Sequence, residues 1–280
     1  MVAFKTKLDQ IPAGGVALVG IPCDENASFL RGAAAAPARI RQAFRCASTN
    51  RCCENGTDLQ SHCRFGDLGD IEPKHGAAMI EAIENAIAAL LDRDLRVLSL
   101  GGDHSITYPI IRAYSGRYKS LNVLQIDAHP DLYDHFENNR FSHASPFARI
   151  MENRLAARLV QIGIRTANPH QRLQAERLGV EMVEMYRWSA GNTPRFSGPL
   201  YISIDLDAFD PAFAPGVSHP EPGGFDTRTV IAMIQQIQAP VVGADIVELN
   251  PSRDPNGATA MLAAKLLKEV AAKMLVCEEI

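Results

Sequence analysis

Short apolar runs alternate with longer stretches of mixed polarity along most of the chain. The runs contain few polar positions, a pattern typical of parallel strands that are covered on both faces. On this basis we predict strands at residues 16–21, 96–100, 121–126, 159–164, 180–183, 200–204 and 241–247.

Between the runs, apolar residues recur at helical spacing, most clearly at Met79, Ile83 and Ile87. Such spacing predicts amphipathic helices. We expect helices near residue 38, at 77–91, 106–114 and 147–151, after Pro169, and at 227–237 and 258–276. The segments predicted to be loops are rich in polar residues, glycine or proline, and they cover residues 24–37, 46–63 and 210–224.

The alternation of strand and helix predicts an α/β protein with three layers, α-β-α, around a central, mainly parallel sheet. Neither an internal repeat nor a linker divides the 280 residues, so we expect a single domain over residues 1–280. In open parallel sheets, ligands bind beyond the carboxyl ends of the strands. We therefore expect the functional residues at one rim of the sheet.

The composition is that of a soluble globular protein, with 46% hydrophobic and 21% charged residues. Because 28 basic and 32 acidic residues give a formal net charge of −4, we expect no nucleic-acid partner. The sequence has neither a signal-peptide pattern at its start nor an apolar run long enough for a transmembrane helix. We therefore predict a cytoplasmic protein without a membrane partner.

Six cysteines are present: Cys23, Cys46, Cys52, Cys53, Cys63 and Cys277. Cys52, Cys53 and Cys63, with His62 beside them, raise the alternative of a zinc knuckle. Their spacing lacks the paired C-x2-C arrangement of such sites, so we expect reduced thiols in a loop.

Polar motifs follow several of the predicted strands. The run that begins at Leu200 ends in D-L-D, and side chains two apart on an extended segment point the same way, so Asp205 and Asp207 should converge. Burying two carboxylates together is costly unless a cation compensates their charge. G-G-D-H-S, D-A-H-P-D and E-L-N-P follow three other runs, and all four strand ends should lie on one rim.

These motifs supply two imidazoles and four carboxylates without a thiolate. Such a set favours a hard or borderline cation such as manganese over a structural zinc. Four carboxylates carry more negative charge than one divalent ion neutralises, so two ions fit better, and two-metal sites activate the water between the ions. The candidate ligands are His104, Asp127, His129, Asp131, Asp205 and Asp207.

Each of these residues also has a structural explanation when it is taken alone. Asp103 or Asp127 is often the cap of a loop, and His129 is often a hydrogen-bonded histidine of the core. That explanation requires several independent strand ends to carry metal-binding residue types by coincidence, so we favour the metal centre.

The same motifs resemble those of the ureohydrolase family of arginases, agmatinases and guanidinobutyrases, in order and spacing, over nearly the whole chain. The matching stretches include S-I-D-L-D-A-F-D-P-A-F-A-P-G and A-D-I-V-E-L-N-P-S-R-D. Three others look most like plant-type arginases, and they cover Ser28–Gly32, Phe141–Met151 and Ala214–Gly224.

The resemblance implies an arginase-like fold and a binuclear manganese centre on the six candidate ligands, with nickel or cobalt as alternatives. It also implies that metal-activated water attacks the guanidinium carbon, and that Asp131 belongs to the catalytic residues. His143 would shuttle protons, or would simply be a polar residue at a helix start. Glu248 would bind the guanidinium, or would pair with a structural arginine such as Arg253.

L-Arginine is the expected substrate, with urea and ornithine as products. Agmatine and other small guanidino compounds remain alternatives, because the positions at Thr166 and Asn168 differ from animal-type arginases and residues 216–220 differ from agmatinases. Asn139 and Arg140 are hypothesised to meet the substrate carboxylate, although Arg140 is equally explained as a surface residue. His219 is either a further substrate contact or a loop residue.

Two other classes of function remain open. One is an inactive metal-binding regulatory subunit, which would not require the full set of ligands, and the other is a deacetylase-like amidohydrolase, which would not require Glu248. The resemblance further suggests a homo-oligomer, either a trimer or a hexamer.

Overall fold

An eight-stranded sheet forms the centre of the protein in a computed structural model that describes residues 6–72, 74–189 and 193–276. The strand order is β2-β1-β3-β8-β7-β4-β5-β6, and neighbouring strands pair in parallel throughout. The strands are β1 (Val16–Ile21), β2 (Phe65–Asp70), β3 (Arg96–Gly101), β4 (Asn122–Ile126), β5 (Arg158–Ile164), β6 (Glu181–Glu184), β7 (Leu200–Asp205) and β8 (Val241–Val247).

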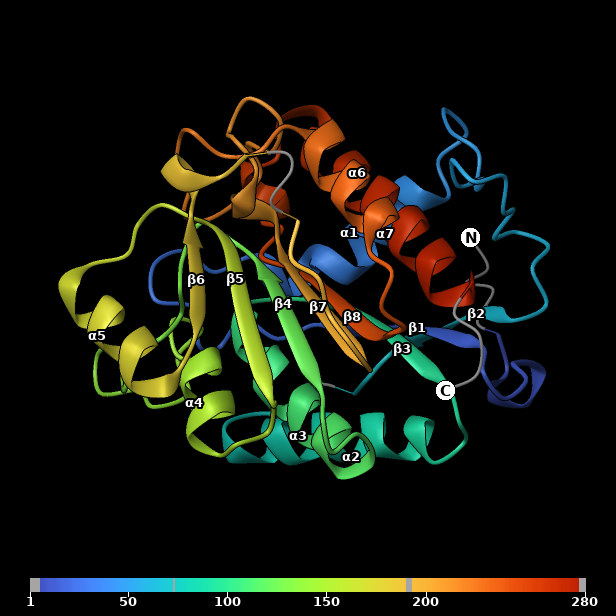
Figure 1. Ribbon diagram of the computed structural model, residues 1–280. Coiled ribbons are helices and arrows are strands. Elements are labelled where there is room, and N and C mark those ends of the chain that lie inside the picture. The colour runs from blue at the N-terminus through green and yellow to red at the C-terminus, as the bar shows by residue number, and fades with distance from the viewer. Residues whose placement is uncertain (1–5, 73, 190–192, 277–280) are drawn as a thin grey trace.

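Helices cover both faces of this sheet, so the fold is the predicted three-layer α/β arrangement (Figure 1). One face carries α2 (Ala77–Leu91), α3 (Thr107–Arg117) and α4 (Pro146–Glu152), with α5 (Pro169–Leu178) beside α4. The other face carries α1 (Ala36–Phe44), α6 (Thr227–Gln236) and α7 (Ala258–Val276). Among the described residues, no helix combines the length and apolar character that crossing a membrane requires.

Alternation along each central strand divides the apolar core between the two faces. In β1, Val16 and Leu18 pack under α1 and α7, whereas Ala17 and Val19 pack toward α2 and α3. All six residues of β1, β3 and β7 are buried, as expected for strands that helices cover on both sides. The seven predicted strands are confirmed, and the predicted helices correspond to α1 to α7 with shifts of a few residues at their ends.

The eighth strand, β2, was not predicted from the sequence. Its residues, F-G-D-L-G-D, contain few of the apolar side chains that mark the other strands. It forms an edge of the sheet, and its carboxylates are neutralised by α1: both oxygens of Asp67 accept hydrogen bonds from Nε of Arg41 at 3.0 Å, and Asp70 also pairs with Arg41. Tertiary ion pairs therefore stabilise β2, whereas the strand prediction relied on apolar side chains.

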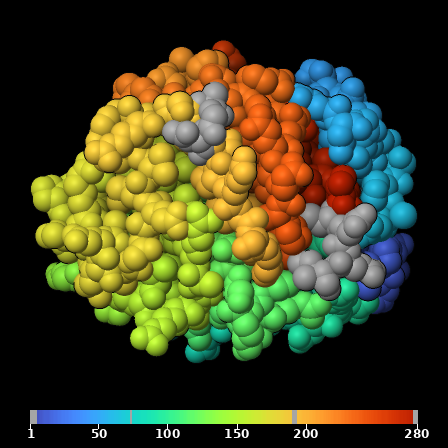
Figure 2. Space-filling view, in the orientation of Figure 1, coloured from blue at the N-terminus to red at the C-terminus, as the bar shows by residue number. Residues whose placement is uncertain are grey.

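The polar loop over residues 46–63 lies along α7, as the light-blue and red atoms of Figure 2 show. The thiol of Cys53 is buried there and donates to the carbonyl of Lys268 at 3.1 Å. The prediction of reduced thiols is confirmed for the described cysteines, which are all free, while Cys277 lies outside the described residues.

Candidate metal centre

Four neighbouring strands in the middle of the sheet, β3, β8, β7 and β4, carry the predicted site residues at their carboxyl ends. His104 starts a short 3-10 helix, His104–Ile106, just after β3. The Asp127 motif follows β4, Asp205 is the last residue of β7, and Glu248 follows β8 directly. The sheet order therefore brings together residues that are up to 144 positions apart in the chain.

Five of the six predicted ligands form two overlapping groups that share Asp127. One group is His104, Asp127 and Asp131, and the other is Asp127, His129 and Asp207, with the ligand atoms of each group within 4.8 Å of one another. Asp205 belongs beside the first group, because its Oδ2 lies 3.2 Å from Nδ1 of His104. Because it belongs to both groups, Asp127 could serve both ions of a two-metal site.

Hydrogen bonds fix which nitrogen of His104 faces these carboxylates. Nε2 lies 2.8 Å from Oγ of Ser203, whose hydroxyl donates to Asp245 at 2.7 Å. Ser203 therefore accepts from His104, which places a proton on Nε2 and leaves Nδ1 of the neutral ring with a lone pair for a metal ion.

Nδ1 of His104 is buried and has no hydrogen-bond partner, although carboxylate oxygens of Asp127, Asp131 and Asp205 lie 3.1 to 3.2 Å away. A lone pair facing three carboxylates is repulsive unless a cation lies between them. This unpartnered nitrogen is the observation that fits a metal ion best. The second imidazole, His129, places its Nδ1 2.9 Å from Asp207.

The carboxylates of the cluster cannot all ionise without such a cation. Burial, together with the charge of Asp127, raises the pKa of Asp131 to about 6. Burial and the neighbouring Asp207 and Asp127 hold the pKa of Asp205 well above its ordinary value. Asp127 is the exception in the metal-free cluster, because His104 and His129, when protonated, outweigh its burial and lower its pKa. Divalent cations would supply the missing positive charge, so the residues fit a metal centre built from oxygen and nitrogen ligands.

Amide side chains beneath the cluster orient the shared carboxylate. Gln125 donates to Oδ2 of Asp127 at 2.7 Å and to the carbonyl of His129 at 2.9 Å, and Gln161 donates to the carbonyl of Pro130 at 2.6 Å. Asp131 itself has a positive φ of 52°. Non-glycine residues in this region persist where the surrounding structure holds them.

His143 and Glu248 form a buried pair at the edge of the cluster. Nδ1 of His143 lies 2.7 Å from Oε1 of Glu248, and the same oxygen accepts the backbone N–H of His104 at 2.9 Å. Burial lowers the pKa of His143, but the carboxylate of Glu248 raises it more, to about 9. Glu248 therefore pairs with His143, and the alternative pairing with Arg253 is not found.

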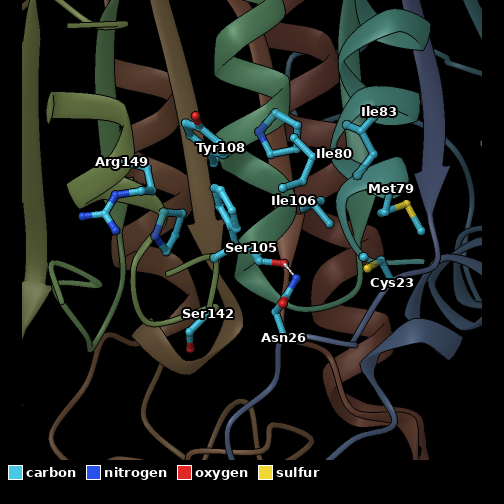
Figure 3. A pocket seen from close by; sticks show the side chains of 14 residues that line it. Cys23, Asn26, Met79, Ile80, Ile83, Ser105, Ile106, Tyr108, Ser142 and Arg149 are labelled. Carbon is cyan, nitrogen blue, oxygen red and sulfur yellow. Dashed lines mark hydrogen bonds between the residues drawn. The ribbon is translucent and has the colours of Figure 1, made fainter. Parts of the chain in front are cut away.

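The segment before α1 holds the other side of His143. The backbone N–H of Ser28 donates to Nε2 of His143 at 3.2 Å, and the Ser28 hydroxyl lies 2.7 Å from the same atom. Asn26 accepts the backbone N–H of His143 at 3.1 Å. Figure 3 shows Asn26 bonded to Ser105 at the end of a small apolar cavity between α2 and α3, which contains no carboxylate and is thus not the metal centre.

The structure does not bring Asn139 and Arg140 to the cluster. The Arg140 side chain is 61% exposed and pairs with Glu152, and Asn139 donates to Asn26 at 2.9 Å. Neither residue lines the cavity at the cluster. The hypothesis that they meet a substrate carboxylate is therefore not supported, because the loop directs them toward α4 and toward the segment before α1.

A cavity of about 370 Å³ opens beside the cluster. Its lining includes four of the candidate ligands and the buried pair: His129, Asp131, Asp205, Asp207, His143 and Glu248. His219 lies at its side, with its ring centre 5.2 Å from that of His143 and 5.7 Å from that of Phe29. Other lining residues include Tyr133, Thr166, Gln171 and Glu221. The volume suits a small molecule that reaches the metal ligands.

Several supporting residues were not identified from the sequence. Ser28 and Ser203 begin stretches that resemble family motifs but were given no role there, and Gln125 lies in a strand without a motif of its own. Only the folded chain shows that they contact His143, His104 and Asp127. A polar residue inside an otherwise apolar strand, as at Ser203 and Gln125, is the one signal that could have indicated them.

Comparison with known proteins agrees with this site. A profile of the Arginase family matches residues 14–272. The mitochondrial Arginase 1 of Arabidopsis thaliana is 47% identical over 274 residues, covering 92% of this chain and 80% of that protein. Guanidinopropionase of Pseudomonas aeruginosa is 33% identical over 274 residues, covering 91% of this chain and 85% of that protein.

The structure of an arginase from Medicago truncatula superposes with a TM-score of 0.88 at 42% identity, covering 92% of this chain and 87% of that one. The family profile, the plant relative and the shared fold agree with one another. The chain therefore belongs to the Arginase family and is a hydrolase that acts on the C–N bonds of amidines.

Proposed function

We propose that this protein hydrolyses L-arginine to L-ornithine and urea, using two Mn²⁺ ions held by His104, Asp127, His129, Asp131, Asp205 and Asp207. The observation that carries the proposal is the pair of ligand groups that share Asp127, beside a cavity that is lined by the candidate ligands His129, Asp131 and Asp207 and fits a small substrate. Substantial identity with a plant arginase supports arginine as the substrate. Ni²⁺ or Co²⁺ in place of Mn²⁺ remains compatible with the same ligands.

The bound ions would lower the pKa of water enough for it to act as a nucleophile at neutral pH. The protein's own groups bind and orient the substrate. Oε1 of Glu248 is occupied by His143 and by the backbone of His104, whereas Oε2 has no partner in the described chain. That oxygen is available to a guanidinium N–H, and a charge-assisted hydrogen bond there would direct the guanidinium carbon toward the metal ligands.

His143 is placed to manage protons during the reaction. It lines the cavity, and Glu248 raises its pKa to about 9, so its Nε2 can take up a proton near neutral pH, with the Ser28 hydroxyl in place to accept from it once the N–H of Ser28 is released. An imidazolium beside the guanidinium can protonate the leaving amine as the C–N bond breaks. Its other nitrogen contacts the Ser28 hydroxyl, which gives a route for the proton to be replaced.

Agmatine is the second candidate substrate. Among the described residues that line the cavity, there is no lysine or arginine that would pair with the carboxylate of arginine. Agmatine has no carboxylate, so its binding would not leave a carboxylate without a partner in this cavity. Hydrolysis of another small guanidino compound stays open on the same grounds.

The proposal is tested by assaying urea release from L-arginine, agmatine, 4-guanidinobutyrate and smaller guanidines, with Mn²⁺, Ni²⁺ and Co²⁺ in turn. We expect L-arginine with Mn²⁺ to give the highest kcat/KM, and Asp127→Asn to abolish release. A higher kcat/KM for agmatine than for L-arginine would show that agmatine is the preferred substrate. If no guanidino compound gave urea with any metal, the inactive regulatory subunit would be the better account.

Assembly and location are proposals of the same kind. A trimer or hexamer is expected from the resemblance to the family and is tested by light scattering of the purified protein. The cytoplasmic location is a prediction from the sequence alone, and the Arabidopsis thaliana relative is named as mitochondrial. Imaging of the tagged full-length protein tests it.

A further inference from the structure

The cavity wall beside the metal cluster contains one carboxylate that the proposed reaction leaves unassigned. Glu221 lines the cavity but belongs neither to the candidate metal ligands nor to the His143–Glu248 pair. Its side chain makes no hydrogen bond or ion pair within the described chain, where only its backbone carbonyl is bonded. Since none of the described residues that line the cavity is a lysine or an arginine, Glu221 is a half-buried negative charge on the lining of the space that a substrate would occupy.

Gln171 provides a second, independent observation on the same cavity. It is only 4% exposed and lines the cavity, yet its side-chain amide has no hydrogen-bond partner among the described residues. Its backbone N–H is already taken by the side chain of Asn168 at 2.9 Å. The amide of Gln171 is therefore free to form hydrogen bonds with a molecule that occupies the cavity.

Glu221 is held at a fixed place relative to the metal ligands. Nε of Arg165 donates to the carbonyl of Glu221 at 3.1 Å, and Nη2 of the same guanidinium donates to the carbonyl of Asp207 at 2.7 Å. Further bonds reach the carbonyls of Gly163 and Ala208 at 3.2 and 3.3 Å. One side chain thus connects the loop of Glu221 to a metal ligand, so the separation between them is set before substrate binds.

We propose that Glu221 is a specificity-determining residue that binds the ammonium group at the far end of the guanidino substrate, with the amide of Gln171 as a neighbouring acceptor. The inference rests on the proposed function, and it names the substrate class as guanidino compounds with a second cationic group. L-Arginine and agmatine belong to this class. A guanidino acid without an amine, such as 4-guanidinobutyrate, would instead bring its carboxylate to a negatively charged wall.

The test compares the Mn²⁺-loaded wild type with Glu221→Gln, which removes the charge and keeps the shape. Glu176→Gln is the matched control, because Glu176 is an exposed carboxylate on α5 that lies outside the cavity. For L-arginine and agmatine we expect KM to rise about tenfold in Glu221→Gln with kcat nearly unchanged, as for loss of one charged hydrogen bond. KM for 4-guanidinobutyrate should stay the same or fall, and Glu176→Gln should change none of these values.

Calorimetric binding of L-ornithine, and of L-arginine and agmatine to the metal-free protein, provides a readout that does not depend on turnover. We expect Glu221→Gln to weaken all three by about tenfold, while thermal unfolding shows the variant folded as the wild type is. An equal rise in KM for all substrates, or unchanged binding of the amines, would overturn the inference. If the wild type released no urea, the proposed function would fail, and the binding data would still decide the role of Glu221.

Discussion

The imidazole of His104 illustrates how a single hydrogen bond prepares this site. Ser203 accepts from Nε2, so the unprotonated Nδ1 faces three carboxylates. The motif that contains His104 could be recognised from the sequence, but its tautomer could not, because Ser203 is 99 positions away. The same holds for Ser28 and Gln125, which bond to residues of the site through tertiary contacts alone.

Replacing Ser203 by alanine should weaken metal binding without removing a ligand. The loss of the Nε2 acceptor frees the ring of His104 to rotate and to change tautomer, and such changes typically cost about 10- to 100-fold in metal affinity. Manganese titration of the purified variant measures the effect. Ser99→Ala is the control, because Ser99 is also a buried serine of the sheet, but its hydroxyl has no partner. Equal affinities in both variants would show that the ring is held by other contacts.

Glu248→Gln should lower the pKa of His143. The carboxylate raises that pKa to about 9, and a neutral amide cannot do so. A raised histidine pKa stabilises the fold below the ordinary value of 6.5, and this contribution is lost as the pH rises through about 9. NMR titration of the metal-free protein should show His143 titrating nearer its ordinary value in the variant. An unchanged titration would mean that another group controls the pKa.

At the scale of elements, apolar runs identified the strands that helices cover on both faces. β2 was missed because its carboxylates pair with Arg41 of α1 and with Arg45 directly after that helix, and periodicity does not reveal such pairs. The rim of the sheet was predictable for a different reason. Polar motifs that follow buried parallel strands must meet at one edge, and β3, β8, β7 and β4 are neighbours there.

Two glycines, Gly243 on β8 and Gly116 on α3, should respond in opposite ways to substitution by alanine. A Cβ at Gly243 would lie 2.1 Å from the hydroxyl oxygen of Tyr114, so Gly243→Ala should destabilise the protein by about 1–3 kcal/mol. A Cβ at Gly116 on α3 would meet nothing within 4 Å, so Gly116→Ala should stabilise it by roughly 0.5 kcal/mol. Urea denaturation measures both changes. A neutral Gly243→Ala would show that Tyr114 moves aside freely.

At the scale of the whole molecule, one sheet is shared by two apolar clusters. Every central strand contributes to both clusters, as Val16 and Ala17 do in β1. We expect this arrangement to unfold as one unit, in line with the prediction of a single domain. Calorimetry of the metal-free protein should then give one transition, with equal calorimetric and van't Hoff enthalpies for each folded unit. Two separated transitions would indicate parts that unfold independently.

Two metal positions that share Asp127 are the central feature proposed for this protein. The direct measurement is the amount of manganese that each chain retains after free metal has been removed. Elemental mass spectrometry determines this amount. We predict two ions per chain for the wild type, because two ligand groups meet at that carboxylate. Asp127→Asn weakens both groups and should retain neither ion. One ion or none in the wild type, or two ions in Asp127→Asn, would contradict the shared metal centre.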